Sequence, residues 1–474
     1  MSKIVVDVWV ADLTFPGYMD RLWKLGEEFD RAHPEYHINI QGLDFRNLPK
    51  LISDAAAEGR PPAIAEYYFS VTQAARDTLA ANGEPQFTSV EKAIAGRTEI
   101  LGEPVVIDDI IPAIRDYYTY DGDLTSMPSV GTTSLLYANR TLLSAAGLAE
   151  LPQTWDEVEA VCEVISRLPH GPSHAITWAN HGTFFQQAVA SQGGLLSDSH
   201  NGRSGRASII DLHSAEMLTW VRWWQKLHRD GHYLYTGKIP DWEGTLRAFA
   251  EQRVALRITS SNDVNYMVTA ARNAGFEIEV GGFPFNTEVP YDGNAVAGTS
   301  LWLADGLDEA TQDGALAFLQ FMHNPRNAAE QHKLNSFVPI TQASFDLLAS
   351  EGWFDQHPYH RVASDHLNFY PSRVTNHTPS AANDTPPSEG ALFGDFAGAQ
   401  DVMTNAMGDV LAHGADPVER FTRASAEAQQ LLDDYHLDCV GTGPRDPQSL
   451  RVEYFRDAEV YSGADLENVA QLRR

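Results

Sequence analysis

Acidic and histidine side chains gather in one short stretch of the sequence, at Asp355, His357, His360, Asp365 and His366. Their spacings fit no closed metal site, so solvated polar residues are the expected interpretation. The sequence contains no GxSxG, HExxH or Walker motif, and no GxGxxG follows a predicted strand. We therefore predict neither a metal, nor a cofactor, nor a catalytic residue.

Aromatic side chains are better candidates for a site. Tyr67, Tyr68 and Phe69 end the third predicted strand, and open α/β sheets place ligands beyond the ends of their strands. Because side chains alternate along a strand, one of the two tyrosines faces inward, and we favour Tyr68 as the ligand-facing one. Trp9 closes the first predicted strand, where packing in the core and stacking on a ligand are both open interpretations.

Small and hydroxyl-bearing residues fill two segments that break the pattern of strands and helices. The first contains Gly131, Thr132 and Thr133, and the second contains Gly298 and Thr299. Backbone that passes close to a ligand, or between two lobes, favours residues of this kind. A plain turn is the alternative for the first segment.

The overall composition excludes several classes of partner. The 474-residue chain has 64 acidic and 34 basic side chains, and its net charge of -30 repels phosphate backbones and anionic lipid headgroups. We therefore expect no nucleic-acid partner. Cys162 and Cys439 form neither a CxxC nor a cysteine–histidine cluster, and no stretch approaches the roughly 18 apolar residues that span a bilayer.

The first third of the sequence predicts alternating strands and helices. The strands are expected at 4–10, 36–41 and 63–68, and the helices at 18–33 and 48–57. Further helices are expected at 215–230 and 311–323, and after Thr154, whose capping-box partner is Glu157. Since parallel strands need crossover helices, this order indicates an α/β fold with an open sheet.

Six segments between residues 4 and 437 occur in the same order as in a known protein family. They are PPAIAEYY, MPSVGTTSLLYANRTLLSAAGL, LPQTWDEV, LRAFAEQRVALRITSS, AVAGTSLWLADG and FLQFMHNPRNAAEQHKLNSFVPITQASFD. In this order they resemble the sugar-binding branch of the extracellular solute-binding proteins of ABC importers, and most of all the glycerol-3-phosphate-binding type. The resemblance implies a periplasmic-binding-protein-like fold, with two α/β lobes, three crossings and a ligand in the cleft between the lobes.

The resemblance also implies where the crossings and the ligand contacts lie. Crossings are expected near 131–134, 297–300 and 336–341. The candidate ligand-binding residues are Trp9, Tyr68, Phe69, Gly131, Thr132, Thr133, Trp178, Asn180, His181, Ser260, Ser261, Gly298, Thr299, Phe337 and Leu392. The first lobe is expected to contain residues 1–131 and 299–335, the second 132–298 and 336–437, and a C-terminal extension 438–474.

Two departures from the family pattern bear on the ligand. The relatives' Gly-Tyr pair in the third crossing is Ser336-Phe337 here, which removes a phenol hydroxyl. The arginine that holds phosphate in the glycerol-phosphate type aligns with Leu392. Burying a phosphate without a charge partner costs several kcal/mol, so we predict a sugar-like or glycoside-like ligand without phosphate.

Partners and location follow from the resemblance as expectations. A member of this family is a monomer that delivers its small-molecule ligand to an ABC permease pair. Its location is periplasmic or membrane-tethered if a leader has been removed, and cytoplasmic if Met1 is the native start. We predict that it is not an enzyme; a cytoplasmic enzyme or a ligand sensor on the same scaffold is the alternative.

Overall fold

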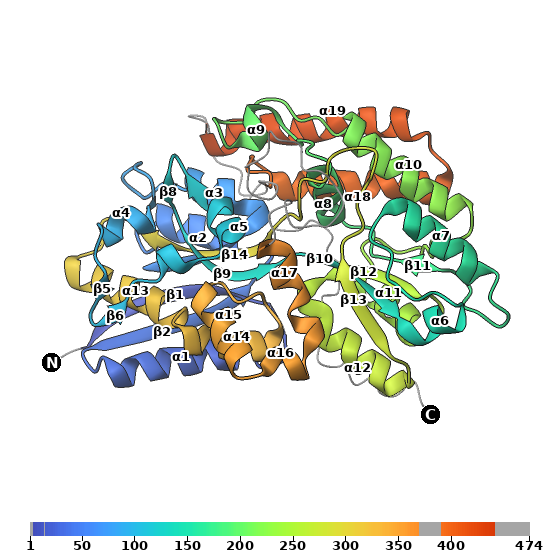
Figure 1. Ribbon diagram of the computed structural model, residues 1–474. Coiled ribbons are helices and arrows are strands. Elements are labelled where there is room, and N and C mark those ends of the chain that lie inside the picture. The colour runs from blue at the N-terminus through green and yellow to red at the C-terminus, as the bar shows by residue number, and fades with distance from the viewer. Residues whose placement is uncertain (1–2, 14, 369–389, 441–474) are drawn as a thin grey trace.

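The computed structural model describes residues 3–13, 15–368 and 390–440. Within them the chain forms two α/β lobes, each built on its own sheet (Figure 1). The predicted α/β architecture is therefore confirmed. The expected C-terminal extension at 438–474 lies outside the described residues, apart from residues 438–440.

The first lobe contains a six-stranded sheet in the order β2-β1-β3-β14-β4, with β9 also paired to β14. Its strands are β1 (Ile4–Asp12), β2 (Tyr36–Asp44), β3 (Ile64–Tyr68), β4 (Phe87–Thr88), β9 (Met127–Thr132) and β14 (Ala297–Ala304). β1 pairs in parallel with β2 and β3, as the alternation of strands and helices predicts. β14 runs antiparallel to β3, β4 and β9.

The second lobe contains a four-stranded sheet in the order β11-β12-β10-β13. Its strands are β10 (Ser134–Asn139), β11 (Ile176–Thr177), β12 (Leu256–Ser260) and β13 (Ile278–Gly282). Two short hairpins complete the strands: β5 (Glu99–Ile100) with β6 (Glu103–Pro104), and β7 (Thr119–Tyr120) with β8 (Asp123–Leu124). The central strand β10 is buried along its whole length because it has neighbours on both sides.

The helices begin and end close to the predicted positions. Thr154 caps α7 and forms the predicted capping box with Glu157. The helices are α1 (Tyr18–Ala32), α2 (Leu48–Ala57), α3 (Thr72–Asp77), α4 (Val90–Ile94), α5 (Pro112–Tyr117), α6 (Arg140–Ala145), α7 (Trp155–Ser166), α8 (Gly182–Ala190), α9 (Asp198–Gly202), α10 (Ala215–Arg229), α11 (Trp242–Ala250), α12 (Val264–Ala274), α13 (Glu309–Met322), α14 (Pro325–Asn335), α15 (Gln342–Ser350), α16 (Trp353–Gln356), α17 (Val362–Asn368), α18 (Phe396–His413) and α19 (Pro417–Tyr435). Within the described ranges, no helix is long and apolar enough to cross a membrane.

The chain passes between the lobes at two adjacent strands. β9 belongs to the first sheet and β10 to the second, so the first passage lies at Thr133; the return passage lies between β13 and β14. Gly131 of β9 pairs with Gly298 of β14, so the two passages lie side by side. A Cβ at Gly298 would lie 1.9 Å from the Val130 carbonyl oxygen, which explains the glycine there.

The third expected crossing differs from the prediction. The Val338 amide donates to the Gly131 carbonyl at 2.9 Å, and α15 packs on α14 beside α1, so residues 336–356 remain with the first lobe (Figure 1). α17 is the next helix to contact the second sheet, at β13. The predicted start of the last second-lobe segment, residue 336, is therefore too early because this segment hydrogen-bonds to a first-lobe strand.

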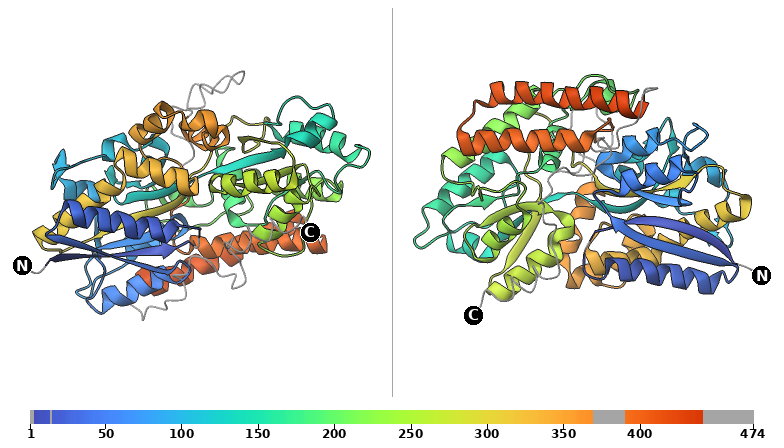
Figure 2. Two further views of the ribbon diagram at one scale, coloured as in Figure 1. Left: turned by 90° about the horizontal axis from the view of Figure 1, so that it is seen from below. Right: turned by 180° about the vertical axis from the view of Figure 1, so that it is seen from behind.

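Helices α18 and α19 lie antiparallel along one side of the molecule and extend over both lobes (Figure 2). α18 contacts α8 of the second lobe and the short helical turn Phe69–Val71 of the first. These helices therefore bring residues late in the sequence to the space between the lobes.

Candidate ligand-binding site

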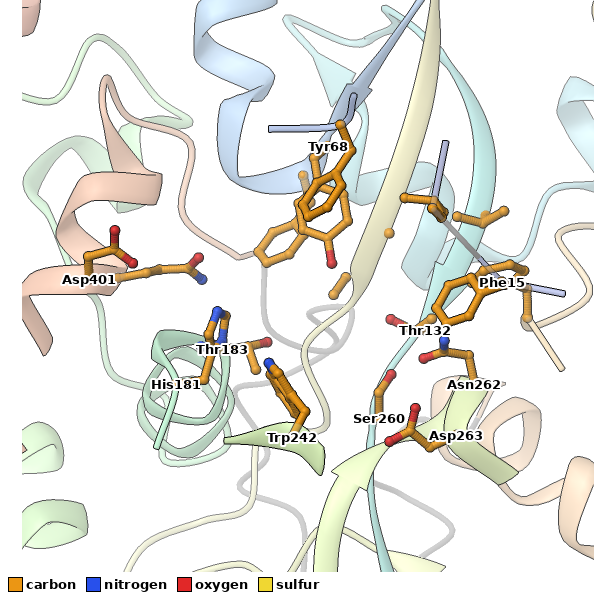
Figure 3. A pocket seen from close by; sticks show the side chains of 18 residues that line it. Phe15, Tyr68, Thr132, His181, Thr183, Trp242, Ser260, Asn262, Asp263 and Asp401 are labelled. Atoms are coloured by element: carbon orange, nitrogen blue, oxygen red, sulfur yellow. Dashed lines mark hydrogen bonds between the residues drawn. The ribbon is translucent and has the colours of Figure 1, made fainter. Parts of the chain in front are cut away.

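A cavity of about 180 Å³ lies between the lobes, next to the two passages (Figure 3). Both lobes contribute to its wall. The lining residues are Leu13, Phe15, Phe45, Tyr68, Phe69, Val130, Thr132, Ala297, Gly298 and Phe337 on the side of the first lobe, and His181, Thr183, Trp242, Ser260, Asn262, Asp263, Gln400 and Asp401 on the side of the second.

Aromatic rings enter the cavity from both lobes. Tyr68 ends β3 and reaches the cavity, whereas the preceding Tyr67 is buried in the core, as the alternation along the strand predicts. Phe15 and Phe337 meet edge to face with their ring centroids 5.8 Å apart. Trp242, the first residue of α11, enters from the second lobe (Figure 3). These rings can offer apolar faces to a ligand from two sides.

Hydroxyl, amide and carboxyl groups lie between these rings. Ser260 ends β12 and is followed by Asn262 and Asp263, which bring an amide and a carboxylate to the wall. The Asp263 carboxylate accepts from Thr259 Oγ1 at 2.6 Å and lies 3.5 Å from the fully buried guanidinium of Arg257. Its charge therefore has a cationic partner behind the cavity wall.

His181 is a neutral hydrogen-bonding group of the site. It caps α8, and its Nδ1 accepts from the Thr183 amide at 3.1 Å, so the ring carries its proton on Nε2. Burial lowers the pKa of His181 to about 4, which keeps the ring uncharged at pH 7. His181 can therefore donate one hydrogen bond without adding charge.

The described lining of the cavity includes the carboxylates of Asp263 and Asp401 but no lysine or arginine. A phosphate group held there would lie near two carboxylates and would find no cation in this set of residues. A hydroxyl or an ammonium group can instead donate to a carboxylate oxygen. The described lining therefore carries two carboxylates, and one of them, Asp263, is paired with Arg257 behind the wall.

The structure divides the predicted site residues into three groups. Those that line the cavity are Tyr68, Phe69, Thr132, His181, Ser260, Gly298 and Phe337. Others support the passages: the Thr133 amide donates to Ser261 Oγ at 3.1 Å, and the Ser261 amide donates to the Thr133 carbonyl at 2.8 Å. Gly131 accepts from Val338, and Thr299 donates from Oγ1 to the buried carboxylate of Glu66.

Both predicted stacking tryptophans lie elsewhere. Trp178 is only 1% exposed and packs in the core against Trp220, Trp224 and Tyr233, with ring centroids 5.6, 4.9 and 4.5 Å away. Trp9 is half-buried and packs on the core instead of the cavity. Its strand continues to Asp12, so the residues that pass beyond the strand end and reach the cavity are Leu13 and Phe15.

Asn180 and Leu392 also lie away from the cavity lining. The Asn180 amide donates to the Thr404 carbonyl at 2.8 Å and thereby ties its loop to α18. Leu392 is 2% exposed, and its backbone amide donates to the Asn201 carbonyl at 2.8 Å. Both positions are occupied by core contacts, so the structure corrects their predicted place in the site.

Eleven lining residues are absent from the predicted site, and four of them bring an aromatic ring or a carboxylate from an unexpected segment: Phe15, Phe45, Trp242 and Asp401. Trp242 has only a partial signal in the sequence, because Asp241 caps α11 by accepting from the Gly244 amide at 2.9 Å, which marks the start of the helix but not the direction of its first side chain. For the other three, only the packing of distant segments brings them to the cavity.

Glu66 is a fully buried carboxyl at the passage of β14. It accepts from the Ala11 amide at 2.8 Å and from Thr299 Oγ1. Burial raises the pKa of Glu66 above its usual value of 4.5, against the lowering effect of these hydrogen bonds. The folded chain therefore holds a proton on this group more tightly than the unfolded chain does.

This raised pKa predicts a dependence of stability on pH. Because the folded pKa exceeds the unfolded one, the contribution of Glu66 is present below about pH 4.5 and is lost as the pH rises through the folded value. We expect the free energy of unfolding, measured with urea from pH 4.5 upward, to fall less steeply with pH in Glu66→Gln than in the wild type. The exposed Glu150→Gln is the control, and equal slopes for Glu66→Gln and wild type would contradict the prediction.

Comparison with known proteins identifies the family. The sequence profile of the bacterial extracellular solute-binding proteins matches residues 24–358. The chain belongs to this family. Membership of an extracellular family implies an extracytoplasmic location. The sequence is 26% identical to the sn-glycerol-3-phosphate-binding periplasmic protein UgpB of Salmonella typhimurium over 72% of this chain and 75% of that protein. It is 25% identical to UgpB of Escherichia coli O1:K1, with the same two coverages.

Solved structures of solute-binding proteins share the fold. UgpB of Mycobacterium tuberculosis, in complex with glycerophosphocholine, matches with a TM-score of 0.67 and 18% identity over 92% of this chain and all of that one. The cyclic α-maltosyl-1,6-maltose binding protein of Arthrobacter globiformis matches with a TM-score of 0.68 and 16% identity over 91% of this chain and all of that one. At these identities the likeness establishes the fold. The relatives are binding proteins, and this chain is a solute-binding protein of the transport type.

Proposed function

We propose that this chain binds a small sugar-like solute, neutral or cationic, between its lobes and delivers it to an ABC importer. The observation that carries the proposal is the cavity itself, which combines aromatic faces with hydroxyl, amide and carboxyl groups and has no lysine or arginine among its described lining residues. Sugar-like ligands present apolar ring faces together with many hydroxyls, so a site for them needs both kinds of group.

One relative supports a sugar-like solute and another does not discriminate. One solved neighbour is named for an oligosaccharide, whereas another was solved with glycerophosphocholine, which carries a phosphate group. The curated relatives are named for sn-glycerol-3-phosphate, an anion that the charge of this cavity disfavours. We therefore place the solute of this chain nearer to the uncharged glycosides and aminosugars.

The proposal includes a mode of action. The solute closes the lobes by contacting both at once, the aromatic faces supply much of the binding energy, and the polar groups fix its orientation. The closed monomer then presents the solute to a pair of permease subunits outside the cytoplasm. The chain acts by binding, without a catalytic step.

Native mass spectrometry of protein purified from its own host tests the proposal. Closed clefts often retain solute through purification, so we expect an additional mass that corresponds to a non-phosphorylated sugar-like compound. The solute should be lost on mild activation, because it is held without a covalent bond. A retained phosphate ester or nucleotide would contradict the proposal.

Trp242→Ala should weaken binding of that solute without unfolding the protein. Loss of one stacking ring removes apolar burial worth about 1–3 kcal/mol of affinity, roughly ten- to a hundred-fold in Kd. Calorimetric titration gives the affinity, and the thermal midpoint of the same samples gives the stability. The half-buried Trp9→Ala, away from the cavity, is the matched control and should leave Kd unchanged. Equal Kd values for Trp242→Ala and wild type would remove this ring from the site.

A further inference from the structure

A second, smaller cavity lies behind the wall of the ligand cavity. Its volume is about 30 Å³, and it shares Val130 and Phe337 with the larger cavity. It is enclosed by the first half of α1, the end of α13, α14, β9 and residues 337–340. We call it the hinge cavity because it adjoins the first passage between the lobes at Gly131.

Four polar atoms of the hinge cavity lining are buried and have no hydrogen-bond partner within the described residues. They are Tyr18 Oη, His323 Nε2, Gln331 Oε1 and His332 Nε2. The Ser129 hydroxyl also lines the hinge cavity and acts on the phenol to lower the pKa of Tyr18, but it does not meet Tyr18 Oη in hydrogen-bonding geometry. Buried polar groups in native proteins nearly always have a partner, so four orphans around one cavity point to an occupant.

The hydrogen bonds of the two histidines decide what the occupant must offer. His332 Nδ1 lies 2.7 Å from the Phe337 carbonyl oxygen, which can only accept, so Nδ1 carries the proton and Nε2 is an acceptor. His323 likewise donates to the Pro128 carbonyl, which leaves its Nε2 as an acceptor. Burial lowers the pKa of both rings to about 4, so both stay neutral at pH 7.

The remaining two groups complete the set. Gln331 donates from Nε2 to Asn335 Oδ1 at 3.0 Å, so its Oε1 is left as an acceptor. Burial raises the pKa of Tyr18 well above its usual value, so its phenol keeps its proton and can donate. The hinge cavity therefore presents three acceptors and one donor, and its occupant must supply hydrogen-bond donors.

We propose that ordered water fills the hinge cavity and is held by His323, Gln331, His332 and Tyr18. Each water molecule supplies two donors, so three acceptors require two molecules, one of which also accepts from the phenol. A volume of about 30 Å³ has room for two molecules at the 10–15 Å³ or so that each needs. The water links α1, α13 and α14 to the chain that carries Phe337. Through His332 and the Phe337 carbonyl it positions the ring that lines the ligand cavity.

A crystal structure of the full chain at about 1.5 Å tests the occupant directly. We expect density within about 2.7–3.2 Å of the two Nε2 atoms and of Gln331 Oε1, the distance range of hydrogen bonds. Density at about 2.0–2.1 Å from the histidine nitrogens, a metal distance, would overturn the proposal, as would an empty cavity.

Three tyrosine-to-phenylalanine variants test the same point in solution. Tyr233 Oη donates to the Trp178 carbonyl at 2.7 Å, whereas Tyr118 Oη is buried and without a partner in the described structure. Tyr233→Phe therefore shows the effect of losing a hydrogen bond, and Tyr118→Phe shows the effect of removing an unpaired hydroxyl. If water is bound, Tyr18→Phe loses a hydrogen bond and should lower the urea midpoint as Tyr233→Phe does. If the hinge cavity is dry, Tyr18→Phe removes an unsatisfied group and should behave like Tyr118→Phe, with no loss, which would overturn the proposal.

Discussion

Replacing Trp178 with alanine is expected to lower the free energy of unfolding by about 3–5 kcal/mol, the range for a large aromatic residue removed from a core. Its indole is 1% exposed and packs against Trp220, Trp224 and Tyr233, and its carbonyl accepts from Tyr233 Oη at 2.7 Å. Urea unfolding monitored by circular dichroism measures the change.

The same samples separate stability from binding. Trp178 is not part of the cavity lining, so solute affinity in the folded fraction should stay within a factor of two or so of the wild type. Trp9→Ala, at a half-buried position, should cost clearly less stability than Trp178→Ala. A large loss of affinity with little loss of stability would return Trp178 to the binding site and contradict its placement in the core.

For sn-glycerol-3-phosphate, we expect a dissociation constant no tighter than millimolar, a binding free energy of about 4 kcal/mol. The described lining offers no arginine or lysine to the phosphate and brings Asp263 and Asp401 near it. Leu392, aligned with the phosphate-holding arginine of the relatives, is buried away from the cavity. A dianion would therefore lose its hydration without gaining a charge partner.

Isothermal calorimetry with a panel of equal-sized ligands checks this expectation. Glycerol-3-phosphate is compared with neutral methyl glycosides and with aminosugars at the same ionic strength, because salt screens charge and narrows the difference. The neutral and cationic compounds should bind more tightly. Micromolar affinity for glycerol-3-phosphate would show that the cavity acquires a cation from elsewhere and would reverse the proposed ligand class.

The sequence predicted those parts of the fold that depend on local patterns. The capping box of Thr154 and Glu157 marks the start of α7 because both its hydrogen bonds lie within four residues. The alternation at Tyr67 and Tyr68 sorts one ring to the core and one to the cavity because neighbours on a strand face opposite sides. Gly298 marks a passage between the lobes because the backbone of β14 approaches the Val130 carbonyl closely at this residue.

The rest of the site depends on contacts between segments far apart in the sequence. Trp178 and Trp242 are both tryptophans near a helix start, and the distant aromatic neighbours Trp220, Trp224 and Tyr233 make the first a core residue. Asp401 reaches the cavity because α18 extends across the lobes. No local sequence pattern predicts this position of α18. The first strand was predicted to end at Val10, two residues before its observed end at Asp12. The aromatic residue expected at the cavity was therefore Trp9, whereas the one that lines it is Phe15.

The pairing of Gly131 with Gly298 has a mechanical consequence. Two hydrogen-bonded strands that run side by side form a narrow ribbon, which bends easily. The same ribbon resists sliding of one strand along the other, because sliding would break the hydrogen bonds between them. We therefore expect the two lobes to rotate about this ribbon as rigid bodies. Access to the solute is then expected to depend on one opening angle between the lobes.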